Sequence, residues 1–180
     1  MSKPEIWFAD LTHTAQGISA NTFPLGVSFV VSYAKQQFGN EFAFKLFKFP
    51  DYLNQSLTQQ SPAVLCCSNY SWNFELSYKF ATLAKLRDPS VVTVFGGPNF
   101  PSDSDEKVDF LRKRPNIDFY IELEGELGFV DLMTKLADFG LDFKKLKNQR
   151  ELILNTSYLD KDELIIGAIE RIHDINVIPS

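Results

Sequence analysis

The sequence predicts an α/β protein built on a five-stranded parallel sheet, in the strand order 2-1-3-4-5, with flanking helices. Short apolar stretches alternate with helical stretches along the chain, as is typical of βαβ units with right-handed crossovers. Residues 62–67 are nearly all apolar, like strands buried on both faces of a parallel sheet. The apolar stretch 91–95 stops at Gly96-Gly97-Pro98, a turn almost without side chains at the strand end where ligands bind in such sheets.

The first half of the chain is expected to hold three strands and a helix. Residues 6–11 and 42–49 are the first two strands, and Lys45 and Lys48 in the second are typical of a sheet edge. Between them, Pro24 suits the first position of a helix and Gly39 its end. The apolar residues of that helix recur at helical spacing: Val27, Val30, Val31, Ala34 and Phe38. The third strand is the stretch 62–67.

The second half continues the alternation. A helix carries an apolar side made of Leu76, Phe80, Leu83 and Ala84, and the fourth strand is 91–95. Ser102, with Asp105 three positions later, marks the start of a short helix. The fifth strand is 117–121, and a last helix spans 125–138. The whole pattern is that of a flavodoxin-like (Rossmann-like) domain.

The character of the chain changes after Gly140. A polar stretch with Lys144, Lys145, Lys147 and Arg150 precedes two short strands, 151–155 and 163–166. Asp160-Lys161-Asp162 between them indicates a small C-terminal β-hairpin. We therefore expect an α/β domain over residues 1–140 and a hairpin extension with a linker over 141–180.

Composition narrows the class of partner. The net charge of −5 disfavours a nucleic-acid or anionic-membrane surface as the main partner. No apolar run of about 18 residues occurs that could span a membrane, and the N-terminus lacks the apolar segment of a signal peptide. The adjacent Cys66 and Cys67 lack metal-ligand spacing and cannot close a useful disulfide loop. Free buried thiols in a reducing cytoplasm are the expectation.

Two polar turns at the expected carboxyl edge of the sheet are candidates for ligand binding. The first loop holds His13, which suits either a ligand or acid/base role or an ordinary solvated position. No Cys/His/carboxylate cluster, Gly-x-Gly-x-x-Gly fingerprint or phosphate-binding loop accompanies it. The turn from Ser68 to Asn73 offers hydroxyls, amides and two aromatic rings at a helix start. This turn is equally suited to binding a large flat ligand and to capping the N-terminus of the helix.

Three glutamates end the fifth strand, at Glu122, Glu124 and Glu126. A helix N-terminus just beyond them is a favourable place for such carboxylates. They are either first-turn acids or acceptors for the hydroxyl, amide or ribose groups of a ligand.

The order of these motifs resembles a known family. Phe23-Pro24-Leu25-Gly26, Ser-x-Tyr-x-Trp-Asn from Ser68, Gly-Gly-Pro from Gly96 and Glu-Gly-Glu from Glu124 follow one another. Together they resemble the N-terminal cobalamin-binding domain of cobalamin-dependent radical S-adenosylmethionine (SAM) enzymes, over nearly the whole chain. The resemblance implies a site for cobalamin, a small-molecule cofactor, at the carboxyl edge. The implied cofactor-binding residues are Thr12, His13, Asn21, Pro24, Leu25, Ser68, Asn69, Tyr70, Ser71, Trp72, Gly96, Gly97, Pro98, Glu124, Gly125 and Glu126.

The resemblance also implies a longer parent enzyme, most commonly a methyltransferase. Its radical SAM barrel, holding a [4Fe-4S] cluster and S-adenosylmethionine, would follow the tail from Arg171 and be the main partner of this domain. The signature Cys-x-x-x-Cys-x-x-Cys is absent, so this domain itself is expected to be catalytically silent.

Two further departures from related patterns concern the site. Leu123 stands where the family usually has the first glycine of Gly-Glu-Gly-Glu, which would narrow the ligand slot. The Asp-x-His-x-x-Gly motif of methionine-synthase-type cobalamin domains is absent, since Asp10, His13 and Gly17 have the wrong spacing. We therefore expect the corrin to be held without a protein histidine ligand.

Two alternatives from other classes stay open. One is a degenerate or regulatory flavodoxin-like module that acts as a scaffold. The other is a flavin-binding module in which Tyr70 and Trp72 sandwich an isoalloxazine ring. A receiver-like domain would want paired acids after the first strand and a lysine after the fifth, where this chain has Asp10 alone and Glu122.

Overall fold

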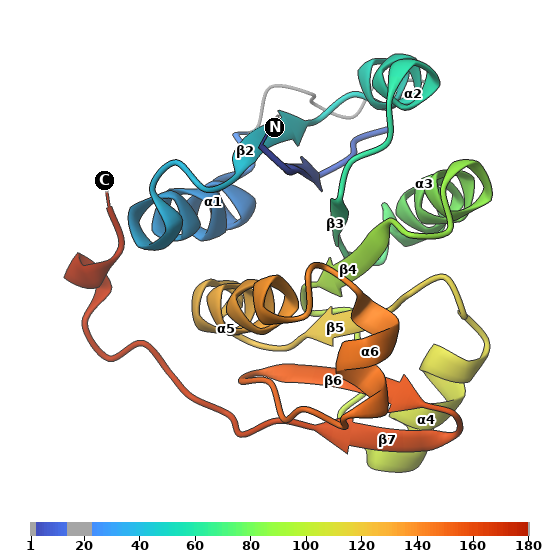
Figure 1. Cartoon of the computed structure of the whole chain (residues 1–180), viewed down its shortest axis with the longest axis vertical. Coiled ribbons are helices and arrows are strands. Elements are labelled where there is room, and N and C mark those ends of the chain that lie inside the picture. Colours follow the sequence, from blue (N-terminus) through green and yellow to red (C-terminus); the bar gives the residue numbers. More distant parts are fainter. Residues whose placement is uncertain (1–2, 14–22, 180) are drawn as a thin grey trace.

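The computed structural model describes residues 3–13 and 23–179 and shows one twisted sheet with helices on both faces (Figure 1). In chain order the elements are β1 (Glu5–Ala9), α1 (Leu25–Phe38), β2 (Ala43–Phe47), α2 (Pro50–Gln59), β3 (Val64–Ser68), α3 (Phe74–Arg87), β4 (Val92–Gly96), α4 (Ser104–Arg112), β5 (Phe119–Ile121), α5 (Gly125–Asp138), α6 (Phe143–Asn148), β6 (Thr156–Asp160), β7 (Glu163–Ile166) and the short 3₁₀ helix η1 (Ile175–Val177).

The sheet has seven strands in the order β2-β1-β3-β4-β5-β6-β7. The first five are parallel and follow the predicted order 2-1-3-4-5, with the lysine-bearing β2 at the edge. The predicted count of five strands is wrong, because the C-terminal hairpin continues the sheet. Its β6 pairs antiparallel with β5, through Tyr120 opposite Ser157 and Ile121 opposite Thr156. The hairpin thereby covers an edge of β5 that would otherwise expose an apolar strand.

The hairpin begins later than predicted. Its first strand is β6 at 156–160, and the predicted stretch 151–155 leads into it. Ile153 of that stretch is fully buried in the core, and Asn155 has a left-handed backbone with φ of 49°. A residue in that conformation interrupts an extended strand, so pairing starts only at Thr156.

Helices cover both faces of the sheet. One face packs against α1, α5 and α6, and the other against α2, α3 and α4. Neither α2 nor α6 was predicted from the sequence. In α2, only Leu53 and Leu57 are fully buried, and α6 buries only Leu146. Such short helices in polar stretches give too few apolar repeats to reveal a helical period.

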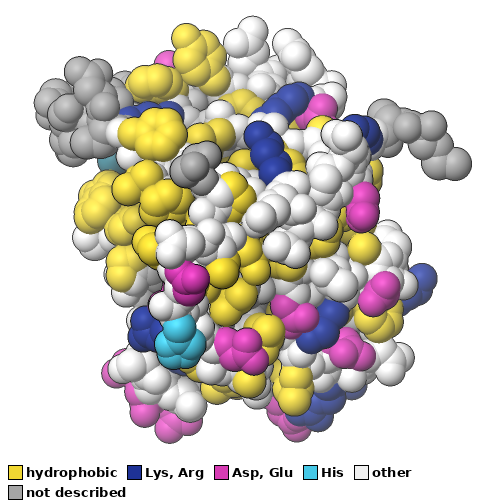
Figure 2. All heavy atoms as spheres, turned by 90° about the vertical axis from the view of Figure 1, so that its left-hand side faces the viewer, with side chains coloured by type: hydrophobic (Ala, Val, Ile, Leu, Met, Phe, Trp, Pro, Cys, Tyr) yellow, Lys and Arg dark blue, Asp and Glu magenta, His cyan; other side chains and the backbone are white. Residues whose placement is uncertain are grey.

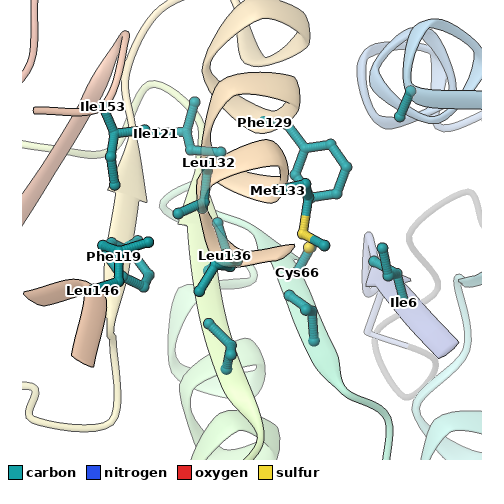
Figure 3. Close-up of a cluster of buried hydrophobic side chains, with 14 of the residues drawn as sticks. Ile6, Cys66, Phe119, Ile121, Phe129, Leu132, Met133, Leu136, Leu146 and Ile153 are labelled. Atoms are coloured by element: carbon teal, nitrogen blue, oxygen red, sulfur yellow. The ribbon is translucent and has the colours of Figure 1, made fainter. Parts of the chain in front are cut away.

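The α5 helix forms the centre of one core layer. Its Phe129, Leu132, Met133 and Leu136 belong to one cluster with Phe119 and Ile121 of β5, and Met133 lies beside Cys66 of β3 (Figure 3). Cys66 and Cys67 of β3 are free and buried and belong to the two opposite core layers, as alternation along a strand requires. In the described part of the chain, no helix is both long and apolar enough to cross a membrane.

Candidate functional site

A cavity of about 510 Å³ opens at the carboxyl edge of the parallel strands, between the ends of β3, β4 and β5 and the N-termini of α1 and α5. Its floor is apolar and its rim carries the polar groups. The floor is made of Phe8, Val30, Val94 and Phe129, and the rim includes Ser68, Tyr70, Gly96, Gly97, Pro98, Glu124, Gly125 and Glu126. This is the position at which open α/β sheets bind ligands.

The turn after β3 is held by a polar network below the surface. Ser68 Oγ donates to Asp10 Oδ1, and Asn73 Nδ2 donates to Ser68 Oγ at 2.9 Å. Asp10 follows the first strand and Asn73 precedes α3, so the network ties the two turns that flank the switch point of the sheet. The ends of β1 and β3 are thereby fixed relative to one another.

Tyr70 and Trp72 stack on each other at the mouth of the site. Their ring centroids are 4.5 Å apart with an interplanar angle of 8°, and Trp72 is 60% exposed. His13 Nε2 lies 2.8 Å from the Trp72 carbonyl oxygen. Because a carbonyl only accepts, that nitrogen carries the hydrogen and donates it. His13 is thus attached to the backbone of the turn that carries the aromatic stack.

Gly97 is required by the protein's own backbone. Its φ is +130°, and a Cβ there would lie 2.6 Å from the carbonyl oxygen of Asn69. Asn69 is fully buried, and its side chain exchanges hydrogen bonds with Asn99. Its Nδ2 also donates to the Tyr120 hydroxyl at 2.9 Å, which in turn donates to the Gly97 carbonyl. The hydrogen bonds of Asn69 therefore hold the Gly-Gly-Pro turn in place.

The three glutamates after β5 have different surroundings. Glu122 accepts from Lys107 at 2.7 Å and from Ser157 at 2.6 Å, so its carboxylate is committed to the protein. Glu124 pairs with Arg171 at 2.9 Å through one oxygen. Glu126 is 8% exposed, and burial, followed by the nearby Glu124 carboxylate, raises its pKa. Two carboxyl groups, at 124 and 126, are thus left at the rim as hydrogen-bonding groups.

Leu123 lies at the rim in an unusual conformation. Its φ is 55°, in the left-handed region that disfavours residues with a Cβ, and its side chain is 54% exposed. It lines the cavity beside Glu122 and Glu124. The position therefore suits glycine, and leucine adds apolar bulk to the mouth of the slot.

The structure brings together half of the sixteen predicted site residues at the cavity. Ser68, Tyr70, Gly96, Gly97, Pro98, Glu124, Gly125 and Glu126 line the cavity. Thr12, His13, Pro24, Leu25, Asn69, Ser71 and Trp72 do not line it. Of these, His13, Ser71 and Trp72 lie in or against the turn that follows β3. Asn21 lies outside the described residues.

Two kinds of residue at the candidate site could not be predicted from the sequence. The residues of the apolar floor are not marked in the sequence, because a strand residue under a cavity has the same kind of side chain as any other buried residue. Arg171, which reaches Glu124 from 47 positions away, leaves no local signal. Leu123 was recognised through its departure from a glycine pattern.

The groups that line the cavity suit hydrogen bonding to a ligand. Among the described residues, no group of three or more His, Cys, Asp or Glu side chains could hold a metal ion. The described lining residues include no Lys, Arg or His. An apolar floor with carboxyl and carbonyl acceptors at the rim suits a large, mostly apolar ligand that carries N–H or O–H donors.

Curated relatives match the chain over part of their length. The 2-(S-pantetheinyl)-carbapenam-3-carboxylate methyltransferase of Streptantibioticus cattleyicolor is 34% identical over 128 residues, which cover 68% of this chain and 18% of the relative. The cobalamin-dependent radical SAM methyltransferase TokK of Streptomyces tokunonensis is 42% identical over 78 residues, covering 43% of this chain and 11% of TokK. The chain thus spans less than a fifth of either relative. No protein-family model matches it.

A solved structure shows the same fold over nearly the whole chain. The cobalamin-dependent S-adenosylmethionine radical enzyme OxsB, with aqua-cobalamin and S-adenosylmethionine bound, matches with a TM-score of 0.72 and 17% identity. The match covers 98% of this chain and 24% of OxsB. OxsB with aqua-cobalamin alone gives a TM-score of 0.71. The predicted resemblance is confirmed: this chain is a homologue of one segment of the cobalamin-dependent radical SAM methyltransferases.

Proposed function

We propose that this chain is the cobalamin-binding part of a radical SAM methyltransferase and that it holds the cofactor at the carboxyl edge of its sheet. The observation that carries the proposal is the cavity of about 510 Å³, whose walls are two of the four motifs that define the resemblance. The Gly96–Pro98 turn forms one wall and residues 124–126 the other.

The residues around the cavity fit a corrinoid. The apolar floor suits the flat heterocyclic base of the nucleotide tail, and the acceptors at Glu124 and Glu126 suit its ribose hydroxyls and the amide side chains of the corrin. The corrin ring itself would lie over the exposed Tyr70–Trp72 stack. Flat aromatic surface of this kind favours contact with a large ring.

His13 is not expected to ligate the cobalt. Its Nε2 donates to the Trp72 carbonyl, which engages one ring nitrogen and leaves Nδ1 with its lone pair. The expectation therefore rests on the spacing of the first loop, which does not match the histidine-ligating motif. We infer that His13 positions the aromatic stack, which agrees with the absence of the Asp-x-His-x-x-Gly motif. The lower face of the corrin would then be covered by protein without a histidine ligand.

In this proposal the chain binds and orients, and the chemistry belongs to the larger protein. Bound cobalamin supplies a cobalt centre that can carry a methyl group. The residues described here would hold the ring in place and exclude water from its lower face. The radical SAM barrel of the parent, with its [4Fe-4S] cluster and S-adenosylmethionine, would lie over the upper face and act as the partner of this domain.

Titration of the whole chain with hydroxocobalamin tests the proposal. We expect a saturable change in the corrin absorption bands and co-elution of the corrinoid with the protein. Absence of both would contradict it. With His13→Ala, the saturated complex should keep the spectrum of the unaltered complex; a changed lower-ligand signature with intact binding would show that His13 ligates the cobalt.

The flavin alternative is disfavoured by the geometry of the aromatic pair. Tyr70 and Trp72 already stack on each other at 4.5 Å, and a third ring between them would need roughly twice that separation. A parallel titration with flavin mononucleotide should therefore leave the flavin fluorescence unquenched.

A further inference from the structure

We propose that the C-terminal segment, residues 167–179, supports the binding site from outside the cavity, and that its Arg171 is a positioning residue that holds Glu124 for a hydrogen-bond donor of the ligand. This inference rests on the proposed function, since it assigns a role within the same cavity. No described residue of the segment lines the cavity directly, so its influence passes through Glu124.

The segment returns from the far end of the sheet to the site. Figure 1 shows it leaving β7, passing α5 and ending beside α1. Near its end, Ser32 of α1 donates to the carbonyl oxygen of Pro179 at 3.2 Å. On the surface that carries these elements, hydrophobic side chains lie next to acidic and basic ones (Figure 2). The segment is thus anchored at both ends, with Arg171 between the anchors.

Asn155 connects the segment to Glu124. Its side chain is fully buried and donates from Nδ2 to the carbonyl oxygens of Glu170, at 2.9 Å, and Glu124, at 3.2 Å. Its Oδ1 accepts from the Glu170 backbone N–H at 2.7 Å. One buried amide therefore fixes the backbone of Glu124 and the backbone next to Arg171 in the same place. This arrangement places the Arg171 side chain within hydrogen-bonding distance of the Glu124 carboxylate.

Among the described residues, only one of the two oxygens of the Glu124 carboxylate has a hydrogen-bond partner. Its Oε1 accepts from Arg171 Nη1 at 2.9 Å. Its Oε2 is buried and has no hydrogen-bond partner among the described residues. A buried carboxylate oxygen without a donor is unfavourable, and Glu124 lines the cavity. A ligand N–H or O–H would donate the missing hydrogen bond to Oε2. Arg171, by holding Oε1, sets the direction in which Oε2 points.

A matched pair of arginine variants tests the role of Arg171. Arg171 and Arg112 are both exposed arginines in ion pairs, at 57% and 51% side-chain exposure. Arg112 pairs away from the cavity, with Asp162 and Asp109. We expect Arg171→Ala to weaken hydroxocobalamin binding about three- to tenfold, Arg171→Lys to restore part of the loss, and Arg112→Ala to leave the affinity unchanged. Thermal unfolding of both alanine variants should be alike, since exposed ion pairs contribute little to stability.

A double-mutant cycle separates positioning from a general structural effect. If Arg171 acts through the Glu124 carboxylate, Arg171→Ala should have no further effect on affinity in a Glu124→Gln background. An equal loss in both backgrounds, or unchanged binding by Arg171→Ala, would overturn the inference while the proposed function stands. If the unaltered chain does not bind hydroxocobalamin, the proposed function fails and this inference fails with it.

Discussion

Gly97 is required by the backbone that surrounds it, and the Gly-Gly-Pro motif does not reveal this role in the sequence. Its φ is positive, and a side chain at this position would bring its Cβ within 2.6 Å of the Asn69 carbonyl oxygen. We predict that Gly97→Ala costs at least about 2 kcal/mol of unfolding free energy. Gly26 is the control, because a Cβ there meets nothing within 4 Å. Gly26→Ala should leave stability unchanged or raise it by up to about 1 kcal/mol. Urea denaturation measures both, and equal effects would contradict the account.

Leu123 should be a site of stored backbone strain. Its φ of 55° is accessible to glycine without the penalty that a Cβ brings. We predict that Leu123→Gly stabilises the chain by about 1 kcal/mol, and that it widens the mouth of the cavity. Leu123→Ala keeps the strained backbone while removing bulk, so it should not share the gain in stability. A loss of stability in the glycine variant would show that the leucine side chain makes contacts that outweigh the strain.

Glu126 should make stability depend on pH. Burial and the neighbouring Glu124 raise its pKa above the ordinary value of 4.5, so the folded chain binds this proton more tightly than the unfolded chain. Its contribution to stability is therefore complete below about pH 4.5 and is lost as pH rises through the raised pKa. Glu126→Gln should be more stable than the unaltered chain above that window, with a difference that vanishes below it. Denaturation curves across this range would contradict the prediction if the difference grew as the pH fell.

At the scale of elements, capping decides where α4 begins. Asp103 occupies the N-cap and accepts from the backbone N–H groups of Asp105 and Glu106 at 2.9 and 3.1 Å. Ser102, which the sequence indicated as the helix start, lies at the cavity rim. We predict that Asp103→Ala destabilises the chain by about 1 kcal/mol, while Ser102→Ala changes stability by less than about 0.5 kcal/mol. Thermal melts distinguish the two, and a larger effect at 102 would reverse the assignment.

Elements whose apolar residues recur at a clear helical or strand spacing were predictable from the sequence. Elements whose bounds depend on contacts with distant residues were not. The α5 helix was predicted with the bounds it has, because Phe129, Leu132, Met133 and Leu136 all face the core. The start of β6 was misplaced because Ile153 is as apolar as a strand residue but packs before the strand begins. Which residues pair with β5 depends on the left-handed Asn155, and no sequence period marks such a residue.

At the scale of the whole molecule, the parallel strand order carries the site. Because β3, β4 and β5 end at the same edge, three turns that are far apart in sequence form one cavity. Its position and two of its walls follow from sequence, since polar and glycine-rich turns mark strand ends. The role of Arg171 does not, because it depends on how the hairpin and the C-terminal segment fold back past α5.

The most direct measurement of the central claim is an NMR titration of the isotope-labelled chain with cyanocobalamin, which is diamagnetic. Binding at the carboxyl edge predicts that the amide signals of Gly96, Gly97 and Gly125 and the indole signal of Trp72 shift together and saturate. The signals of Asp118 and Lys85, which pair at the opposite edge of the sheet, should stay in place. Shifts centred on the opposite edge, or no saturable shift at all, would contradict a corrinoid site in this cavity.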